Sequence, residues 1–337
     1  MANGLTDIAG IRVGQTTDKE AVTGCTVLLF GKPGAAAAVE IRGGAVGERE
    51  LEPLRPGHLV ERIHGLVLAG GSAFGLDAAG GVMRYLEERG IGFETGAARV
   101  PIVPAVILYD LGIGNPRRRP DAAMGYEAAR KASGGPVDEG SVGAGTGATV
   151  GKLFGMARAT KGGLGTATAS LAAGVRVSAL AVVNAFGDVR NPATGEIVAG
   201  LRGGPRSSKF SGTSARMKRG AARRSFGRPA RAGASTTLAV VATNARFEKV
   251  SLLRIAAMAH AGLARTIAPV YSSFDGDVVF AVSLGSKRAD VNAVGTVAAE
   301  AVARAILRGV QKARGLGGVP AARELRGKRA GGPRRRA

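Results

Sequence analysis

Residues 233–243 read GASTTLAVVAT, and here a predicted flexible segment meets a predicted buried strand. From Thr236 onward the residues are mostly β-branched or small and apolar, which predicts a strand over 236–243. The preceding residues 202–231 contain ten basic residues and no acidic one, and Gly, Pro and Ser interrupt them. We therefore expect a flexible basic loop over 202–234 that ends at the first residue of the strand.

Outward from this point, β-rich runs alternate with Ala-rich helical patterns. The runs predict strands over 25–30, 64–71, 174–186 and 277–285, and an extended segment over 99–112. Apolar residues at helical spacing predict helices over 72–90, 252–265 and 289–314. This alternation predicts a mixed α/β sandwich in which helices cover the faces of sheets.

The net charge of the chain is concentrated in two segments. The 337 residues include 47 Lys and Arg against 25 Asp and Glu, a formal charge of +22. Residues 202–231 carry +10 and residues 323–337 carry +6, and we expect a disordered basic tail over 316–337. With 4% aromatic residues and no Trp, the chain has few platforms on which bases could stack. A nucleic-acid partner is therefore disfavoured, and a noncatalytic nucleic-acid-binding protein is kept as an alternative.

Other bulk features exclude further classes of protein. Cys25 is the only cysteine, so an intrachain disulfide is impossible and a reducing cytoplasm is expected. The first 14 residues lack the pattern of a signal peptide, and no run of 18 apolar residues predicts a membrane span. The three histidines have no cysteine partners at ligand spacing, so a zinc site of the usual kind is not expected. Nothing else in the sequence implies a metal or an organic cofactor.

Two glycine-rich runs resemble nucleotide or nucleophile motifs and fail their rules. In SVGAGTGATVGK (141–152), position 146 is Thr, and Leu153 follows Lys152 where a phosphate loop requires Ser or Thr. In GGSAFG (70–75), Phe74 occupies the last position of a Gly-x-Ser-x-Gly elbow. We expect both runs to form turns.

A cut at the start of the predicted strand would create a complete nucleophile. A hydroxyl residue with a free α-amine carries its nucleophile and its base together, because an α-amine titrates near pH 8. No histidine is needed, which suits a chain with three of them. The local sequence alone favours the simpler interpretation, in which Thr236 and Thr237 merely begin a strand.

Six further segments can be compared with known families. They are LVLAGGSAFGLDAAGGV (66–82), RVPIVPAVILYDL (99–111), ATKGGLGTAT (159–168), VNAFGDV (183–189), STTLAVVATNA (235–245) and MAHAGLARTIAPVYSSFDGDVVFAV (258–282). In this order they resemble the DmpA-like aminopeptidase family, and together they extend the resemblance over residues 9–315. The family includes L-aminopeptidase/D-amidases, β-peptidyl aminopeptidases and nylon-oligomer hydrolase. The resemblance implies a precursor that cleaves itself, an N-terminal Ser or Thr nucleophile, and a four-layer αββα sandwich with helices covering two stacked mixed sheets.

The resemblance places the cut between Ser235 and Thr236, which makes Thr236 the nucleophile. Residues 1–235 would form the α chain and residues 236–337 the β chain of one structural domain. The family commonly has Asn or Gly before the cut, and this chain has Ser235. Because of this departure, Ser235 and Thr237 stay as alternative nucleophiles.

The resemblance also supplies partners for the nucleophile. Asn184 matches a motif Asn whose amide would stabilise an oxyanion, although an Asn can also cap a strand end. Lys161 would lower the pKa of the amine or stabilise negative charge, although turn lysines are common. Asp275 and Asp277, at i and i+2, would share one face and hold the Thr236 ammonium, although Asp-Gly is also a common turn. Tyr109 matches a position near the substrate, although it can equally be a core aromatic.

These implications describe a self-processing amide hydrolase of the aminopeptidase type that acts on a small peptide or amide. The sequence leaves open α-peptides, β-peptides, D-amino amides and oligoamides. Relatives in the family are usually homo-oligomers, so a tetramer or octamer is expected. An acyltransferase that uses the same N-terminal threonine, as in the ornithine acetyltransferases, is a further alternative.

Overall fold

The computed structural model describes residues 4–222 and 235–330, and two five-stranded sheets form its centre. The first sheet has the order β1-β2-β5-β8-β4 and is antiparallel except for the parallel pair β5 and β8. Its strands are β1 (Arg12–Asp18), β2 (Thr23–Leu29), β5 (Gly65–Ala69), β8 (Ala105–Ile107) and β4 (Glu48–Arg49).

The second sheet has the order β11-β12-β15-β17-β3 and is also mixed. Only β15 and β17 run parallel to each other, and the other neighbours are antiparallel. Its strands are β11 (Gly163–Ser170), β12 (Arg176–Asn184), β15 (Thr236–Ala245), β17 (Gly276–Lys287) and β3 (Ala36–Gly43). The strand predicted over 236–243 is therefore confirmed as the middle strand of this sheet.

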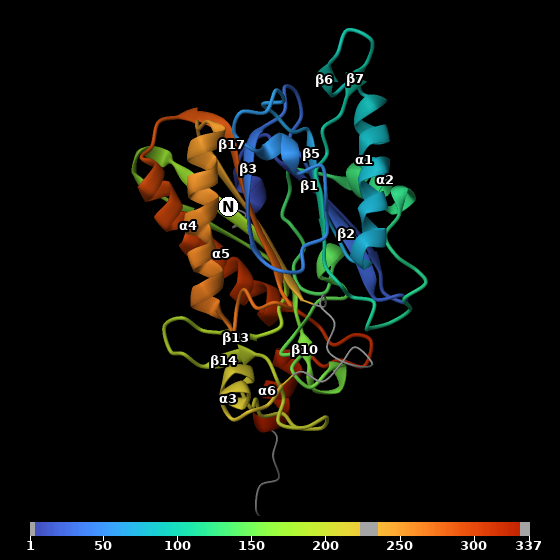
Figure 1. The fold of residues 1–337 in the computed structure, drawn as a ribbon, viewed down its shortest axis with the longest axis vertical. Helices are drawn as coiled ribbons and strands as arrows, with labels where there is room; N and C mark the ends of the chain where they lie inside the picture. Colours follow the sequence, from blue (N-terminus) through green and yellow to red (C-terminus); the bar gives the residue numbers. More distant parts are fainter. Residues whose placement is uncertain (1–3, 223–234, 331–337) are drawn as a thin grey trace, which may run out of the picture.

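Helices cover the outer face of each sheet (Figure 1). Helices α1 (Ala78–Glu87) and α2 (Ala122–Lys131) share one hydrophobic cluster with the first sheet. Helices α4 (Lys249–Thr266) and α5 (Val291–Lys312) share another with the second sheet. A third cluster fills the space between the sheets. The order of layers is helix, sheet, sheet, helix, which confirms the predicted four-layer αββα sandwich.

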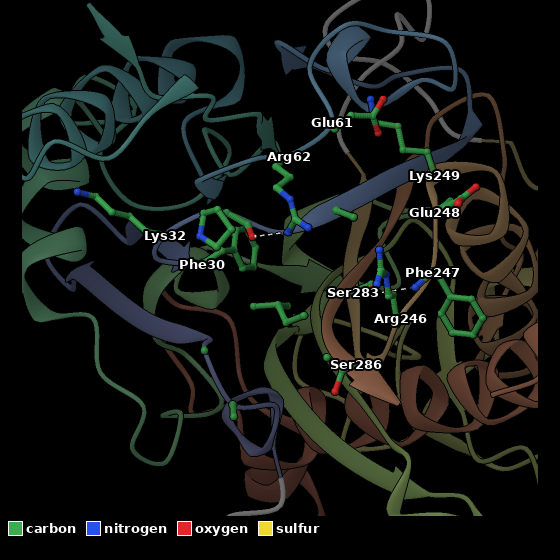
Figure 2. A pocket seen from close by; sticks show the side chains of 17 residues that line it. Phe30, Lys32, Glu61, Arg62, Arg246, Phe247, Glu248, Lys249, Ser283 and Ser286 are labelled. Carbon is green, nitrogen blue, oxygen red and sulfur yellow. Dashed lines mark hydrogen bonds between the residues drawn. The ribbon is translucent and has the colours of Figure 1, made fainter. Parts of the chain in front are cut away.

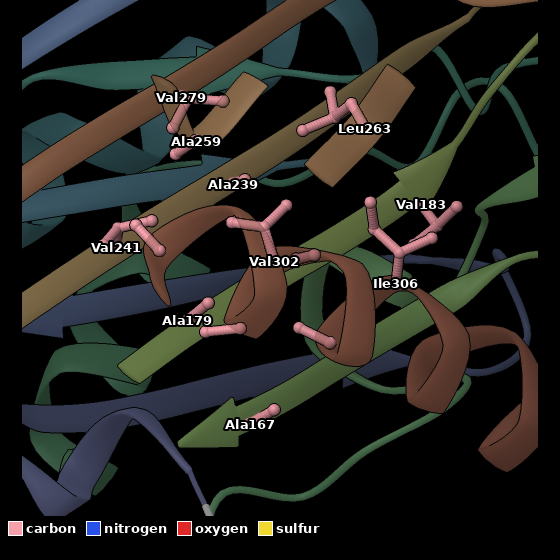
Figure 3. Close-up of a cluster of buried hydrophobic side chains, with 14 of the residues drawn as sticks. Ala167, Ala179, Val183, Ala239, Val241, Ala259, Leu263, Val279, Val302 and Ile306 are labelled. Carbon is pink, nitrogen blue, oxygen red and sulfur yellow. The ribbon is translucent and has the colours of Figure 1, made fainter. Parts of the chain in front are cut away.

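Strand β15 shows why these residues form a central strand. Successive side chains of a strand point to opposite faces, so a strand buried on both faces must be apolar throughout. Ala239 and Val241 pack under α4 and α5 (Figure 3), whereas Leu238, Val240 and Ala242 pack between the sheets. The side chains of the apolar run after Thr236 therefore pack into two hydrophobic cores, one under α4 and α5 and one between the sheets.

Short elements complete the described chain, and several gather at one end of the sandwich, at the bottom of Figure 1. The strands are β6 (Phe93–Glu94), β7 (Arg99–Val100), β9 (Thr149–Val150), β10 (Thr160–Lys161), β13 (Asp188–Arg190), β14 (Ile197–Ala199) and β16 (Ile267–Ala268). The helices are α3 (Thr213–Lys218), α6 (Ala322–Ala330) and the 3-10 helices η1 (Leu5–Asp7), η2 (Glu52–Leu54), η3 (Ser72–Asp77), η4 (Gly143–Gly145), η5 (Met156–Arg158) and η6 (Ala172–Gly174). The helix predicted over 72–90 thus begins as η3 and becomes α-helical at Ala78.

The prediction of a flexible loop over 202–234 is wrong for residues 202–222. Arg202 is buried, and its guanidinium donates to the carbonyls of Ala157, Ala159 and Pro205, which ties the segment to η5 and its surroundings. The segment continues into α3. Residues 223–234 of the predicted loop lie outside the described residues.

The prediction of a disordered tail over 316–337 is wrong for residues 316–330. Leu316 and Val319 form a β-bridge, and α6 follows. Glu324 accepts from the backbone N–H groups of Gly315 and Ala321, at 2.7 and 3.0 Å, and so fixes the turn before the helix. Residues 331–337 of the predicted tail lie outside the described residues.

Candidate active site

Thr236 is the first residue of β15, and its hydroxyl lies against the carbonyl that precedes it. Thr236 Oγ1 donates to the Ser235 carbonyl oxygen at 2.6 Å, and the Gly276 backbone N–H donates to the same oxygen at 3.0 Å. Both Ser235 and Thr236 are buried. The Ser235 carbonyl therefore has a nucleophilic group beside it and a hydrogen-bond donor already directed at its oxygen.

Asn184 ends β12 and is the register partner of Thr236 on β15. Its side chain is fully buried, and contacts orient both ends of the amide. Nδ2 donates to the carbonyl of Tyr109 at 3.1 Å, and Oδ1 accepts from the Thr149 N–H at 3.0 Å. Because an amide nitrogen carries two hydrogens, this arrangement leaves a second N–H for another acceptor.

Lys152 joins the site although its position in the sequence does not predict this. Its Nζ donates to Asn184 Oδ1 and to the Asn184 carbonyl, both at 2.8 Å, and the residue is buried. The available signal was a lysine that ends a glycine run without forming a phosphate loop. The ammonium polarises the Asn184 amide and fixes which of its ends is the donor.

Asp275 and Asp277 lie together as their spacing predicted, but they make different contacts. Asp277 Oδ1 accepts from the Thr237 N–H at 2.6 Å. Asp275 accepts from the Phe186 N–H at 3.1 Å and from Ser272 Oγ at 2.6 Å. Burial, and next the nearby Asp275 carboxylate, raise the pKa of Asp277 well above its ordinary value. The structure thus brings Asp277 to the residue that follows the predicted nucleophile and Asp275 to the residue that precedes it.

Tyr109 and Lys161 take positions that the sequence did not specify. Tyr109 contacts the site through its backbone carbonyl, and its side chain is half-buried. Lys161 is fully buried, and its Nζ donates to the carbonyls of Thr146 and Ala148 at 2.6 and 2.7 Å. Burial lowers the pKa of Lys161 to about 7, and the Asp110 carboxylate opposes that shift. The hydrogen bonds of its ammonium thus go to these carbonyls rather than to Thr236.

A cavity of about 640 Å³ lies away from this group, at the opposite ends of the strands (Figure 2). Arg246, which follows β15, lines it together with Arg62 and Lys249. Ten residues of strand span about 33 Å, so the cavity is far from Thr236. Lys249, the buried cation of its wall, already donates to the carbonyls of Pro53 and Val60. This cavity is therefore separate from the candidate active site.

A second cavity, of about 1010 Å³, lies on the same side of the fold as the candidate residues. Arg202, Arg206 and the turn at residues 315–320 line it, and the Lys161 N–H donates to the carbonyl of Pro320 in that turn. In residues 4–222 and 235–330, no group of three His, Cys, Asp or Glu side chains is arranged to hold a metal ion. None of the helices in these ranges combines the length and apolarity needed to cross a bilayer.

Comparison with known sequences gives matches over nearly the whole chain. The profile of Peptidase family S58 matches residues 3–323. An uncharacterized aminopeptidase of Mycobacterium tuberculosis is 41% identical, over 96% of this chain and 98% of its own length. A 6-aminohexanoate-oligomer endohydrolase of Kocuria sp. is 32% identical, over 89% of this chain and 84% of its own length.

Comparison with solved structures gives matches to the whole fold. The L-aminopeptidase D-Ala-esterase/amidase of Ochrobactrum anthropi, described as a variant of the Ntn hydrolase fold, has a TM-score of 0.71 at 18% identity and covers 98% of this chain and 94% of its own. A β-aminopeptidase of Burkholderia sp. has a TM-score of 0.69 at 22% identity and covers 99% of this chain and 95% of its own. At these identities the two structures show a shared fold.

Proposed function

The chain belongs to peptidase family S58 and is an amide hydrolase of the aminopeptidase type, and on that premise we propose that it cleaves its own Ser235–Thr236 bond and then uses Thr236 as an N-terminal nucleophile. The observation that carries this proposal is the 2.6 Å contact between Thr236 Oγ1 and the Ser235 carbonyl oxygen. Asn184, opposite Thr236 in the sheet, supplies the oriented amide that such a reaction needs.

Self-cleavage begins when Thr236 Oγ attacks the Ser235 carbonyl carbon. As the C–N bond breaks, the proton lost from Oγ passes to the Thr236 nitrogen, and Ser235 becomes an ester on Oγ. Water hydrolyses this ester, which releases the Ser235 carboxylate and regenerates the hydroxyl. The Gly276 N–H, already bonded to the Ser235 carbonyl oxygen, stabilises the negative charge that develops there.

In the processed enzyme, Thr236 carries both the nucleophile and the base. Its neutral α-amine accepts the Oγ proton while Oγ attacks the carbonyl carbon of a substrate amide. The free N–H of Asn184 Nδ2 stabilises the oxyanion, and Lys152 holds Oδ1 so that this donor stays in place. The α-amine passes this proton to the amine of the substrate, which leaves, and water then hydrolyses the acyl-enzyme.

Two further acidic groups and one tyrosine complete the proposed machinery. Asp277 contacts the backbone N–H of Thr237, so it lies next to the position where the Thr236 ammonium forms. Asp275 lies beside Ser235 through a β-bridge and is the charge that faces Asp277. The half-buried Tyr109 side chain is proposed to contact the substrate carbonyl, because its own backbone holds Asn184.

The proposed substrates are small peptides and linear amides with a free amine, or amide oligomers. The names of the matched relatives support both classes, since they include aminopeptidases and a 6-aminohexanoate-oligomer endohydrolase. Hydrolytic relatives over the whole chain favour water as the acyl acceptor over an amine. They also set aside the noncatalytic nucleic-acid-binding alternative.

The deciding experiment is a denaturing gel with intact mass and N-terminal sequencing of the purified protein. Cleavage at this bond divides the 34.0 kDa chain into fragments of about 24 and 10 kDa, and the smaller one begins at Thr236. Thr236→Ala stays full length and inactive. A wild type that hydrolyses amides without being cut would overturn the proposal.

A substrate panel separates the open classes in the same preparation. Aminoacyl, β-aminoacyl and D-aminoacyl p-nitroanilides are compared with a 6-aminohexanoate oligomer, each with and without hydroxylamine as acceptor. Hydrolysis without transfer to hydroxylamine identifies a hydrolase, and dominant hydroxamate formation identifies an acyltransferase. Adding duplex DNA or RNA leaves the rates unchanged if the basic segments are not a nucleic-acid site.

We also propose a cytoplasmic homo-oligomer, a tetramer or octamer. Leu59 and Val250 expose 80% and 68% of their surface on segments that the Lys249–Pro53 hydrogen bond holds together, so they offer an apolar contact surface. Light scattering coupled to size exclusion gives the assembly size. A monomer at micromolar concentration would contradict this proposal.

A further inference from the structure

Asp110 lies between the two glycine runs that failed their motif rules in the sequence. Its Oδ1 accepts from the Gly71 N–H and its Oδ2 from Thr23 Oγ1, both at 2.7 Å. A Cβ on Gly70 or on Gly147 would come within 2.1 or 2.4 Å of Asp110 Oδ2. Only residues without a side chain permit this approach, so the glycines of both runs make room for one buried carboxylate.

Lys161 holds the second glycine run through its backbone. Its buried ammonium donates to the carbonyls of Thr146 and Ala148, which flank Gly147. A Cβ on the same glycine would meet Asp110, so the carboxylate and the ammonium both lie against one short segment. The two charges are also close enough to interact electrostatically.

Both ends of the Asn184 amide form hydrogen bonds to the segments that Asp110 and Lys161 hold in place. Nδ2 donates to the carbonyl of Tyr109, the residue directly before Asp110. Oδ1 accepts from the N–H of Thr149, the residue directly after Ala148. A shift of either segment would therefore rotate or displace the amide of Asn184.

We propose that Asp110 and Lys161 are positioning residues that hold the Asn184 amide in the orientation required for oxyanion stabilisation. This inference rests on the function proposed above, in which Asn184 supplies the oxyanion donor. Neither residue touches the nucleophile in this arrangement. They act through Tyr109 and Thr149, and the glycine runs serve as spacers that bring these charges together.

A buried charge holds the backbone groups around it in place, because each of them would lose its hydrogen-bond partner if the charge were removed. Removing one partner of a buried charged network leaves donors and carbonyls without partners, so the backbone around them shifts to recover hydrogen bonds. A misplacement of about 1 Å at a reacting group can cost about 100-fold in rate. Asp110→Ala and Lys161→Met should thus lower kcat by between about 10- and 100-fold, with KM changed less than about threefold.

The test is a double-mutant cycle on purified, fully processed enzyme, with kcat expressed per active site. One cycle combines Asp110→Ala with Asn184→Ala, and a second cycle combines Lys161→Met with Asn184→Ala. If Asp110 acts through Asn184, its substitution has no further effect on kcat once Asn184 is alanine. Equal fold-losses in the wild-type and Asn184→Ala backgrounds would overturn the inference.

Asp188 offers a matched control for the loss of a buried carboxylate. It is fully buried, accepts from the Leu201 N–H and Thr213 Oγ1 at 2.7 Å each, and burial raises its pKa as it does for Asp110. None of its contacts reaches Asn184. We expect Asp188→Asn and Asp110→Asn to lower thermal stability alike, while only Asp110→Asn lowers kcat. Asp110→Asn should also retain more activity than Asp110→Ala, since it keeps an acceptor for Gly71.

The outcomes separate this inference from the proposed function. If Thr236→Ala is uncut and inactive but the Asp110 and Lys161 variants keep the wild-type kcat, the proposed function stands and the positioning role falls. A variant that cleaves itself slowly is assayed with kcat expressed per cut chain, counted by densitometry of the fragment that begins at Thr236. A variant that stays uncut while Asp188→Asn is cut would place the residue in cleavage and remove the positioning role in turnover. A kcat loss that matches the Asp188→Asn control would likewise remove the positioning role.

Discussion

Asn184 and Thr236 face each other as register partners on β12 and β15. Neighbouring strands lie about 4.8 Å apart, so the sheet itself sets the separation between the proposed oxyanion donor and the nucleophile. The backbone hydrogen bonds of two strands that are buried over almost their whole length maintain this register. The relative position of the two groups is therefore as rigid as the core of the protein.

Replacing the oxyanion donor should lower the rate without disturbing the fold greatly. We expect Asn184→Ala to reduce kcat by about 100- to 1000-fold, because one preorganised donor is lost from a buried site. KM should change little, since the interaction forms mainly in the transition state. Steady-state kinetics on a p-nitroanilide substrate measures both values, and a loss confined to KM would contradict the assignment.

The position of the cut can be tested by removing the hydroxyl groups on either side of Thr236. In the uncut chain, the buried hydroxyls of Ser235 and Thr237 make no hydrogen bond to the described residues, unlike that of Thr236. We expect Ser235→Ala and Thr237→Val to cleave themselves and to yield the same new N-terminal residue, Thr236. An uncut Thr237→Val with a cut Thr236→Ala would move the nucleophile by one residue.

The acidic pair should respond differently in cleavage and in turnover. Burial, and next Asp275, raise the pKa of Asp277, so its titration is shifted toward the neutral acid, and Asn resembles that form. We expect Asp277→Asn to cleave itself within about tenfold of the wild-type rate, whereas Asp277→Leu loses the acceptor for the Thr237 N–H and stays uncut.

Hydrolysis of the substrate requires a different charge on the Asp277 carboxyl group than self-cleavage does. Once the Thr236 ammonium forms, its positive charge favours the ionised form of Asp277, and Asn cannot supply that charge. Processed Asp277→Asn should therefore lose much more of its hydrolytic kcat than of its cleavage rate. Gel densitometry over time and steady-state assays measure the two rates. Equal losses in both would contradict the separate roles.

The part of the fold that sequence predicts well is the part with simple periodicity. The apolar run after Thr236, and the helical spacing over 252–265 and 289–314, correspond to β15, α4 and α5. Family resemblance added the four layers. Local sequence did not show that β12 and β15 would be neighbours, because strand pairing depends on contacts that are remote along the chain.

The errors of prediction have a common physical cause. Charge and glycine content indicated disorder over 202–222 and 316–330, but Arg202 and Glu324 bind backbone groups that composition does not reveal. Lys152 was overlooked for the same reason, since only the fold shows that its ammonium reaches Asn184. Buried charges are recognised by their partners, and partners are a property of the folded chain.

Lys152 should contribute to the rate through the amide that it holds. Lys152→Met removes the ammonium from Asn184 Oδ1 and leaves the Thr149 N–H to hold this oxygen, so the amide is oriented less firmly. We expect kcat to fall by at least about tenfold, and Lys152→Met should have little effect in an Asn184→Ala background. Parallel kcat measurements on the four proteins provide the result, and full additivity would assign Lys152 a separate role.

Lys161 should make stability depend on pH in the alkaline range. Burial lowers its pKa to about 7 in the folded chain, whereas an unfolded lysine titrates near its ordinary value of about 10.4. Between these values the unfolded chain binds one more proton than the folded chain, so stability rises with pH. The slope from this group is at most about 1.4 kcal/mol per pH unit, and it vanishes below pH 6.

The measurement compares Thr236→Ala with Thr236→Ala/Lys161→Met, so that both chains are uncut. Urea unfolding at intervals from pH 6 to pH 9.5 gives the difference in free energy of unfolding, in which groups common to both chains largely cancel. We expect the chain with Lys161 to gain stability relative to the Met variant as the pH rises above 7. A difference that stays constant over this range would mean that Lys161 keeps its ordinary pKa when buried.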